Sequence, residues 1–291
     1  MKGLKDITHE MKSTFKLYCV IGDPINHSLS PLMHNSAFKF LKIDSTYISY
    51  RIPKNELKSG IETLRNIDIS GFNVTIPHKI AIMKYLDRLD ESAIRSGAVN
   101  TVQNLRGKFM GYNTDVYGFM QPLHKRKINF TNMNILILGA GGAAYAIVTS
   151  LSYEKGISEV TILNRSQDNG LDLVKHGSKL GLNCKFQKIS YLSNITLNYD
   201  LIVNATSIGL KNEVSPISAK YIKKDSIVYE IVYRPIYTNL ILNAKQVNAR
   251  IIYGYEMLVE QGAKAFEIWT GRKAPIKTME QSLLGVFGEP K

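Results

Sequence analysis

The chain has 291 residues, of which 44% are hydrophobic and 21% are charged, so it can bury a core in one large domain or two ordinary ones, and disorder is excluded. No apolar run reaches the roughly 20 residues that a membrane-spanning helix needs. The net charge is +13, but Lys and Arg never run beyond three in a row, and neither zinc-finger spacing nor an RNA-binding signature is present. We therefore expect no nucleic acid and no membrane as partners.

Cysteine usage and the first residues indicate a reducing compartment. Cys19 and Cys184 are far apart and flanked by apolar or strand-forming residues, which favours buried free thiols over a disulfide or a metal site. The polar stretch 1–15 has no apolar signal core, and we expect it to form an N-terminal extension. No cluster of His, Cys and carboxylates has ligand spacing, so no metal is expected. We predict a cytoplasmic protein with a small-molecule substrate, as a monomer or homodimer.

Alternating strands and helices begin at Lys16. The apolar patterns predict strands at 17–21, 46–52 and 72–76, and helices at 31–41, 56–67 and about 77–89. Such alternation is typical of a mostly parallel sheet with helices on its faces. The sequence thus predicts a first α/β domain.

A second α/β series starts near residue 134. Residues 135–138 form a short, fully apolar strand of the kind found at the centre of a parallel sheet, and a helix is predicted from the following glycines to about residue 151. Further strands are predicted at 159–163, 185–189, 200–203, 227–232 and 251–253, and a long helix at 256–270. The fold class is therefore α/β with two domains and a cleft between them.

A glycine-rich loop joins the first strand of this second series to its helix. It reads Gly139, Ala140, Gly141, Gly142, Ala143 and Ala144. In a Rossmann fold the first glycine permits the tight turn, the second lets backbone N–H groups approach a pyrophosphate, and the third position, here Ala144, allows close helix packing. The loop predicts a dinucleotide site, against the alternative of a merely structural turn.

The end of the next strand bears on the coenzyme. NAD sites usually place an acid there to bind the ribose, but this chain has Asn164, Arg165 and Ser166. An arginine at this position can pair with a 2′-phosphate through its planar fork, although it could also be an ordinary surface residue. NADP is favoured, and NAD remains possible.

Small polar residues stand where strands of the first series meet helices. Ser28 and Ser30 lie two apart, so in an extended stretch both hydroxyls could face one ligand. Ser30 precedes Pro31, which is also typical of a helix N-cap with proline at the first helical position. Ser28 has no such local explanation.

Two further segments share this character. Asn73 and Thr75 alternate with apolar residues onto one face of a strand, and Lys79 is predicted in the first turn of the next helix, where it opposes the helix dipole. Asn100 and Asp115 lie in the third segment. A solvated surface lysine and an early-helix acid that favours the dipole are the alternative interpretations of Lys79 and Asp115.

These motifs together resemble the shikimate dehydrogenase family from about residue 18 to residue 285, nearly the whole chain. Eight ordered stretches carry the resemblance, and together they are far more specific than any one alone. They are residues 22–31, 73–79, 97–101, 113–115, 139–143, 164–166, 204–209 and 254–261.

The resemblance implies a function and roles for individual residues. The function is the reversible NADPH-dependent reduction of 3-dehydroshikimate to shikimate in aromatic amino acid biosynthesis. Lys79 and Asp115 would form the catalytic pair at the reacting oxygen, and Ser28 and Ser30 would bind the substrate carboxylate. The remaining substrate-binding residues would be Asn73, Thr75, Asn100, Tyr233 and Gln261, and the coenzyme-binding residues Gly139, Ala140, Gly141, Gly142, Ala143, Asn164, Arg165, Ser166, Thr206 and Gly254.

The resemblance also implies a domain plan. Residues 16–114 would bind substrate, 115–252 would form the Rossmann NADP-binding domain, and 253–291 would be C-terminal helices that pack back on the substrate domain.

The chain departs from the family pattern at a few positions. Asn169 stands where a second basic residue is frequent, and Glu230, Arg234 and Tyr145 replace the usual Asp, Asn and basic residue. Two alternatives stay open: a quinate/shikimate dehydrogenase that prefers NAD, and a non-catalytic ligand sensor, against which the retained Lys79 and Asp115 argue. Methylene-tetrahydrofolate dehydrogenase has a similar two-domain plan but lacks the serine and 73–79 motifs.

Overall fold

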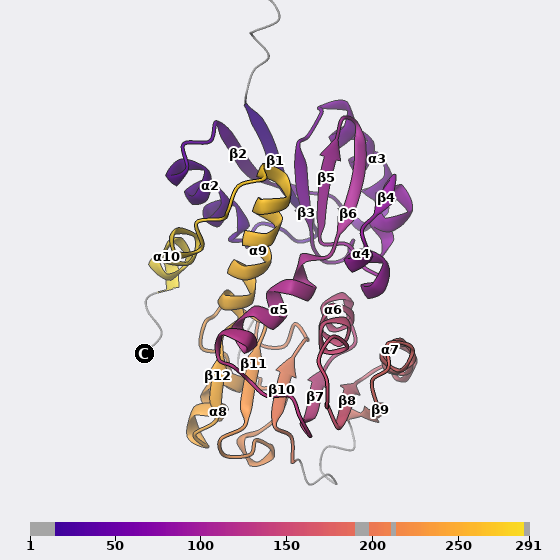
Figure 1. Ribbon diagram of the computed structural model, residues 1–291, viewed down its shortest axis with the longest axis vertical. Helices are drawn as coiled ribbons and strands as arrows, with labels where there is room; N and C mark the ends of the chain where they lie inside the picture. Colours follow the sequence, from indigo (N-terminus) through magenta and orange to yellow (C-terminus); the bar gives the residue numbers. More distant parts are fainter. Residues whose placement is uncertain (1–14, 190–197, 211–213, 288–291) are drawn as a thin grey trace, which may run out of the picture.

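Two six-stranded sheets, one above the other in Figure 1, organise the computed structural model, which describes residues 15–189, 198–210 and 214–287. The strand orders are β2-β1-β3-β5-β6-β4 and β12-β11-β10-β7-β8-β9. The predicted α/β class with two sheet-centred halves is confirmed. The expected extension at 1–15 lies, except for its last residue, outside the described residues.

The first sheet contains six strands between Lys16 and Tyr112. The strands are β1 (Lys16–Gly22), β2 (Ser45–Arg51), β3 (Gly71–Val74), β4 (Arg88–Leu89), β5 (Thr101–Leu105) and β6 (Lys108–Tyr112). Its helices are α2 (Ser30–Phe40), α3 (Leu57–Asn66) and α4 (Glu91–Ser96), with single 3₁₀ turns at Lys54–Glu56 and Ala81–Tyr85. The first three strands are parallel, as predicted, but β5 runs antiparallel to both of its neighbours.

The hairpin of β5 and β6 was not predicted. Its two-residue turn is made by Arg106 and Gly107, both with positive φ (56° and 84°). Turns of this kind match the right-handed twist of the flanking strands and therefore favour tight hairpins. The hairpin leads the chain from Asn100 back to Asp115.

The helix predicted over residues 77–89 is wrong. The chain makes turns, a 3₁₀ helix at Ala81–Tyr85 and then the short strand β4, which pairs with β6. Lys79 therefore lies in a turn, and its carbonyl accepts a hydrogen bond from the Val99 N–H (2.8 Å). Contacts with distant segments replace the local helical bonds that the apolar spacing suggested.

The second sheet is entirely parallel. Its strands are β7 (Asn134–Leu138), β8 (Glu159–Asn164), β9 (Cys184–Lys188), β10 (Leu201–Asn204), β11 (Ile227–Glu230) and β12 (Arg250–Ile252). Counted from β7, the spatial order is that of a Rossmann fold, with the switch point between β7 and β10. The accompanying helices are α6 (Gly142–Leu151), α7 (Gln167–Lys179) and α8 (Asn239–Gln246), and a 3₁₀ turn spans Ala219–Tyr221.

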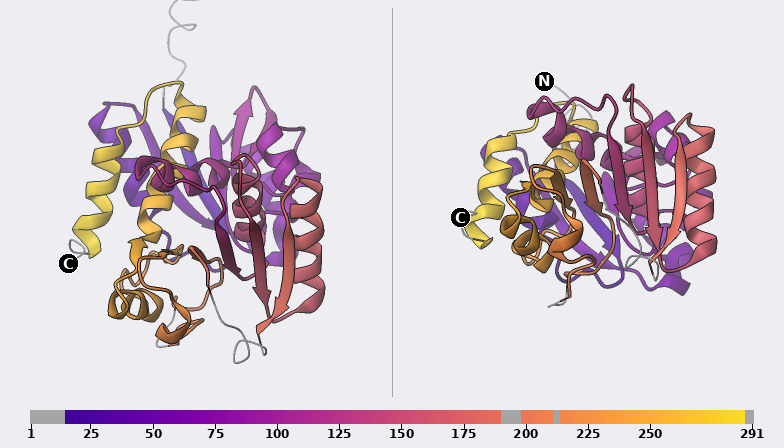
Figure 2. Two further views of the ribbon diagram at one scale, coloured as in Figure 1. Left: turned by 60° about the horizontal axis from the view of Figure 1, so that its bottom comes forward. Right: turned by 90° about the horizontal axis from the view of Figure 1, so that it is seen from below.

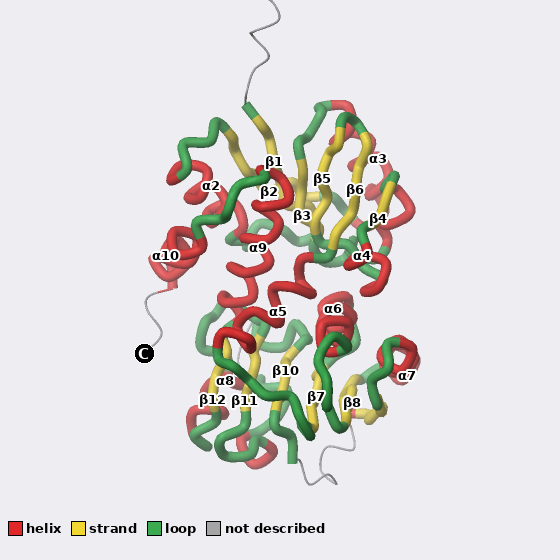
Figure 3. The backbone as a smooth tube through the Cα atoms, in the orientation of Figure 1, coloured by secondary structure: helices red, strands yellow, loops and turns green. Residues whose placement is uncertain are grey.

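Helices α5 (Thr114–Lys125) and α9 (Gly254–Thr270) connect the two sheets: in Figure 3, α5 lies between the sheets and α9 runs from there along the first sheet. They pack against each other so closely that a Cβ at Gly118 would lie 2.6 Å from the Gln261 Cβ. After α9 the chain enters α10 (Ile276–Phe287), drawn in yellow beside the indigo elements of the first sheet in Figure 2. One apolar core joins these C-terminal helices to the first sheet through residues that include Tyr18, Phe38, Phe266, Trp269 and Leu283.

Candidate functional site

Lys79 and Asp115 meet between the two sheets, although 36 positions separate them in the chain. The Lys79 Nζ lies 2.5 Å from the Asp115 Oδ2, and the two side chains are only 15% and 8% exposed. A partly buried ion pair of this kind loses hydration, so its geometry is fixed by its neighbours rather than by solvent. The surface interpretation of Lys79 is therefore wrong.

The position of Asp115 follows from the start of α5. Asn113 is the N-cap of this helix, and its side chain accepts a hydrogen bond from the Asp115 N–H (3.1 Å). Asp115 lies in the first turn, where a carboxylate favours the helix dipole. The local explanation of Asp115 is thus correct and also compatible with its contact to Lys79.

Asn100 holds the other oxygen of the carboxylate. Its Nδ2 donates to Asp115 Oδ1 (2.8 Å) and to Thr114 Oγ1 (3.0 Å), and lies 3.3 Å from Gln261 Oε1. Its Oδ1 accepts from the Thr114 N–H (2.7 Å). The buried Asn100 side chain therefore joins residues that were predicted from three distant motifs. It also contacts Thr114, which was not predicted as a site residue and whose only signal in the sequence is its place next to Asp115.

Asn73 is oriented by the protein itself. Its Oδ1 accepts a hydrogen bond from the buried Tyr47 hydroxyl (2.6 Å), and its Nδ2 donates to the Asn100 carbonyl (3.1 Å) and to Thr101 Oγ1 (3.0 Å). Both amide hydrogens are thereby used, so Asn73 can offer a ligand only an oxygen lone pair. Tyr47 was not predicted as a site residue, because a tyrosine in a β-strand looks like an ordinary strand-forming residue.

Residues 28–30, called the serine loop below, do not form the extended stretch that the sequence predicts. Leu29 is the N-cap of α2 and has helical backbone angles, so Ser30 is already inside the helix and its side chain does not cap it. The N-cap interpretation of Ser30 is therefore wrong. Instead, Ser28 Oγ accepts a hydrogen bond from the Ser30 N–H (3.3 Å).

Two more predicted residues, Tyr233 and Thr75, lie close to the serine loop and to the last residue of β1, respectively. Burial raises the pKa of the Tyr233 hydroxyl, and a hydrogen bond with the Leu29 backbone opposes that rise. Tyr233 therefore lies beside the serine loop. The Thr75 methyl group lies so close to Gly22 that a Cβ there would come within 2.5 Å of it.

The glycine loop has the geometry that a dinucleotide requires. Gly139 has φ of +103°, and a Cβ there would lie 2.9 Å from the Thr206 methyl carbon, so the loop and Thr206 are in contact. Gly141 is the N-cap of α6 without a side-chain cap, and no acid stands in the first turn of that helix. Its free N–H groups and positive dipole end fit a pyrophosphate. A Cβ at Gly142 would be 3.6 Å from the Cβ and Cδ of Lys79, which brings the loop to the Lys79–Asp115 pair.

The end of β8 presents an exposed arginine. Arg165 is exposed, the Asn164 side chain donates to the Ser166 carbonyl (2.9 Å), and Ser166 is the N-cap of α7, accepting from the Asn169 N–H (3.5 Å). Asn169 therefore stands in the first turn of α7 and is exposed. This arrangement can accommodate a 2′-phosphate with one guanidinium.

A buried carboxylate supports the loop after β10. Glu230, 1% exposed, accepts hydrogen bonds from Asn204 Nδ2 (2.8 Å), the Val232 N–H (3.0 Å) and Thr238 Oγ1 (2.8 Å). Asn204 Oδ1 in turn accepts from Thr206 Oγ1 (2.7 Å). Burial raises the pKa of Glu230 to about 7, although its hydrogen bonds oppose the rise.

Gly254 begins α9 against β11. A Cβ there would lie 2.6 Å from the Ile231 carbonyl oxygen, so packing alone requires a glycine. Its predicted contact with the coenzyme stays a prediction.

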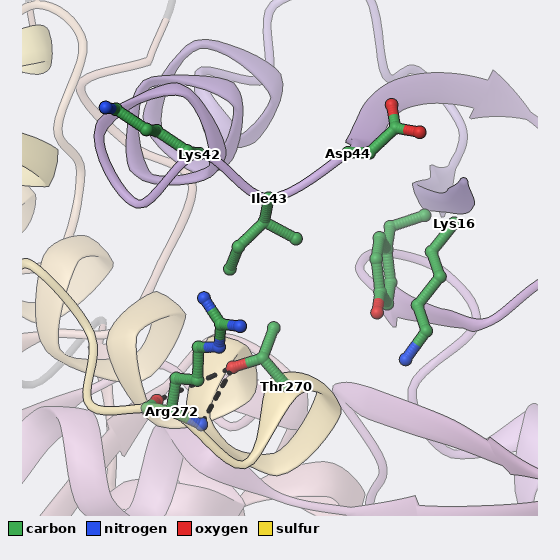
Figure 4. Close-up of a pocket in the computed structure, with 7 residues that line it drawn as sticks. Lys16, Lys42, Ile43, Asp44, Thr270 and Arg272 are labelled. Carbon is green, nitrogen blue, oxygen red and sulfur yellow. Dashed lines mark hydrogen bonds between the residues drawn. The ribbon is translucent and has the colours of Figure 1, made fainter. Parts of the chain in front are cut away.

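Figure 4 shows a hollow on the first half of the molecule. It is lined by Lys16, Tyr18, Lys42, Ile43, Asp44, Thr270 and Arg272. It lies at the amino end of β1, whereas the serine loop follows the carboxyl end of this seven-residue strand. At ~3.3 Å per residue the two ends are about 20 Å apart, so this hollow is separate from the segment that holds Ser28 and Ser30.

Residues 15–189, 198–210 and 214–287 contain neither a metal-binding cluster nor a membrane-spanning helix. No group of three or more His, Cys, Asp or Glu side chains in this part of the chain could hold a metal ion. Within the same ranges, no helix is both long and apolar enough to cross a bilayer.

Three family models match successive parts of the chain. A model described as the shikimate dehydrogenase substrate binding domain matches residues 20–102. One described as shikimate / quinate 5-dehydrogenase matches residues 122–214, and one described as the shikimate 5′-dehydrogenase C-terminal domain matches residues 254–284.

Similar proteins match the chain over nearly its whole length. A curated protein from Nitrosopumilus maritimus, named shikimate dehydrogenase (NADP(+)), is 52% identical over 272 residues, which cover 94% of this chain and 99% of that protein. A solved shikimate dehydrogenase in complex with NADP⁺ has a TM-score of 0.87 and 37% identity over 94% of this chain and 96% of its own. A shikimate 5-dehydrogenase from Listeria monocytogenes, in complex with shikimate and NAD, has a TM-score of 0.83 and 34% identity over 94% and 98% of the two chains.

Proposed function

The chain belongs to the shikimate dehydrogenase family, and we propose that Lys79 and Asp115 are the catalytic pair with which it interconverts shikimate and 3-dehydroshikimate. The protein is an NADP-dependent oxidoreductase. The observation that carries the residue assignment is the buried 2.5 Å contact between Lys79 and Asp115 beside Gly142 of the dinucleotide loop.

Reduction of a ketone needs a hydride on one face and a proton at the oxygen. When bound, the nicotinamide supplies that hydride. The Lys79 ammonium is proposed to donate a hydrogen bond to the reacting oxygen, to stabilise the developing alkoxide and to deliver the proton. Asp115 holds the Lys79 side chain in place through their 2.5 Å contact.

Substrate orientation is assigned to the polar residues around this pair. Ser28 and Ser30, with Tyr233 beside them, are proposed to bind the carboxylate. Asn100 and Gln261 are proposed to hold ring hydroxyls next to Asp115. The remaining predicted contacts are assigned to Asn73, through its oxygen, and Thr75. Positioning of this kind can supply ~7–11 kcal/mol of the barrier reduction.

The coenzyme site is assigned to two loops, the one that joins β7 to α6 and the one that joins β8 to α7. The loop residues Gly139, Ala140, Gly141, Gly142 and Ala143 are proposed to bind the pyrophosphate, and Thr206 to lie beside it. Arg165, with Asn164 and Ser166, is proposed to bind the 2′-phosphate. Support comes from the uncapped start of α6 and from the exposed Arg165 at a strand end where residues 164–166 include no acid, although Asp168 follows in the first turn of α7.

Domain limits, compartment and assembly complete the proposal. We propose a substrate domain of residues 16–114, a Rossmann domain of residues 115–252 and a C-terminal segment 253–291 that belongs with the substrate domain. A cytoplasmic location is supported by the free thiols of Cys19 and Cys184. The assembly is proposed to be a monomer or a homodimer.

One assay tests the function. Purified enzyme is given shikimate or quinate, each with NADP or NAD, and reduced coenzyme is followed by absorbance. We expect the highest kcat/KM with shikimate and NADP. Higher kcat/KM with quinate and NAD would favour the quinate-type alternative, and no turnover with any combination would favour the sensor.

A further inference from the structure

Glu230 lies at the end of β11, directly opposite Asn204 at the end of β10 in the parallel register of these strands. Both side chains are buried. The Asn204 Nδ2 donates one hydrogen to the two oxygens of the Glu230 carboxylate (2.8 and 3.1 Å) and the other to the Ile208 carbonyl (3.1 Å). Because both amide hydrogens are used, the Asn204 amide can turn only by losing buried contacts.

The same amide holds the loop that lies against the glycine loop. Asn204 Oδ1 accepts hydrogen bonds from the Thr206 N–H (3.1 Å) and from the Thr206 hydroxyl (2.7 Å). The Thr206 oxygen in turn accepts from the Ile208 N–H (3.0 Å). The Thr206 side chain is therefore placed by Asn204, and its methyl group lies against Gly139, where a Cβ would come within 2.9 Å of it.

Glu230 also holds both ends of residues 232–238, called the arm below. The Val232 N–H donates to Glu230 Oε1 (3.0 Å). The hydroxyl of Thr238, which is the N-cap of α8, donates to Glu230 Oε2 (2.8 Å). The two oxygens of one buried carboxylate thus fix the beginning and the end of the arm.

The middle of the arm reaches the other half of the molecule. Ile236 belongs to the apolar core that joins the C-terminal helices to the first sheet, and Tyr233 packs against that core. Glu230 receives only donors: an amide, a backbone N–H and a hydroxyl from three different segments. A side chain without oxygens at this position would leave three donors without their acceptor and would separate the arm from the Thr206 loop.

We propose that Glu230 is a positioning residue, which touches neither ligand but holds the Thr206 loop and the arm that carries Tyr233 at a fixed separation. Thr206 is assigned to the coenzyme and Tyr233 to the substrate carboxylate, so this inference rests on the proposed function. Glu230 thereby sets where the substrate lies relative to the coenzyme.

The test measures equilibrium binding of NADP and of shikimate by calorimetry, which needs no turnover. Glu230→Met removes both oxygens and keeps an unbranched side chain, and we expect Kd for NADP and Kd for shikimate each to rise about tenfold. Thr238→Val removes one donor at the end of the arm and leaves the contact between Asn204 and Glu230. Only Kd for shikimate should then rise, by about threefold or more.

Glu230→Gln separates positioning from a general loss of packing. Its carbonyl oxygen can still accept from Asn204 and Val232, and its amide can donate to the Thr238 oxygen, so both Kd values should stay within about threefold of wild type. A neutral side chain is compatible with this site near neutral pH, because burial raises the pKa of Glu230 to about 7.

Asp200→Ala is the matched control. Asp200 precedes β10 at the opposite end of the strand, where its Oδ2 accepts from the Asn134 N–H (2.9 Å). Its removal should lower Tm and leave both Kd values unchanged.

Unchanged Kd values in Glu230→Met, an equally large effect in Glu230→Gln, or the same rise in Asp200→Ala would overturn the proposal. If Glu230→Met does not fold, Thr238→Val decides, because an unchanged Kd for shikimate or an equal rise for NADP contradicts the role of the arm. Failure of the proposed function would be seen separately, as a wild-type enzyme without turnover on shikimate.

Discussion

Asn100 donates a 2.8 Å hydrogen bond to Oδ1 of Asp115, the carboxylate oxygen that Lys79 does not contact. The two oxygens of one carboxylate thus face different partners, an amide on one side and an ammonium on the other. Because Asn100 is itself held by the Thr114 N–H, the carboxylate cannot rotate without breaking a buried contact.

Removal of either member of the proposed catalytic pair, Lys79 and Asp115, should reduce turnover strongly. We expect Lys79→Met or Asp115→Asn to lower kcat by ~10²–10⁴, the contribution of a positioned acid–base group. Steady-state kinetics with shikimate and NADP provide the measurement. Near-wild-type kcat in either variant would exclude that residue from the catalytic role, and circular dichroism would verify that each variant is folded.

The two serines should respond differently to alanine. Ser28→Ala should raise KM for shikimate about ten- to a hundredfold, since a hydrogen bond to a charged group is worth ~1.5–3 kcal/mol, and should also lower Tm, because Ser28 accepts from the Ser30 N–H. Ser30→Ala should raise KM without removing a helix cap, since its own side chain does not cap α2. A larger Tm loss in Ser30→Ala than in Ser28→Ala would contradict the stabilising role assigned to the hydrogen bond between the Ser30 N–H and Ser28 Oγ.

Coenzyme preference should depend on Arg165. Arg165→Ala should erase the preference for NADP and leave the kinetics with NAD nearly unchanged, because the expected contact is specific to the 2′-phosphate. The loss is about ten- to a hundredfold in affinity for NADP. Asn169→Arg adds a cation in the first turn of α7 and should widen the preference. If wild type used NAD better and Arg165→Ala changed neither coenzyme, the residue would have no role in recognition.

Glu230 should make stability depend on pH. Its pKa in the folded protein is about 7 against an ordinary value of 4.5, so the folded state holds the proton more tightly. The stabilisation that comes from the protonated Glu230 is therefore fully present below pH 4.5 and is lost as the pH rises through 7. The free energy of unfolding should fall by about 3 kcal/mol over this range. Urea unfolding of wild type and Glu230→Gln between pH 4.5 and 8 gives the comparison. We expect the difference in unfolding free energy between the two to change across this range, and a constant difference would refute the assignment.

Much of the Rossmann half could be predicted from sequence because its signals are local. The apolar strand β7, the glycine loop and the missing acid after β8 are contiguous features, and each has one structural solution. The region after β3 could not be predicted in this way. Ile80, Ile82, Met83, Leu86 and Leu89 have helical spacing, yet Ile80 is 55% exposed and the segment pairs with β6 and the 97–99 turn.

Candidate site residues could be predicted where they belong to a recognisable motif. They could not be predicted where only the pairing of distant strands places them in the site. Lys79, Asn100 and Asp115 were found through polar residues at strand ends. Tyr47 and Thr101 were missed, because each looks like a β-forming residue of an ordinary strand until β1, β2, β3 and β5 are aligned.

The chain passes between the two sheets only twice within the described residues, once through α5 and once through α9, and these helices pack against each other (Figure 1). Any rotation of one half against the other must therefore turn about this helix pair, which is a hinge by construction. Asp115 and Gln261 lie on these two helices, whereas Lys79 and Gly142 face each other from opposite halves. A rotation of one half against the other would therefore change the distance between the Lys79 side chain and Gly142 of the glycine loop.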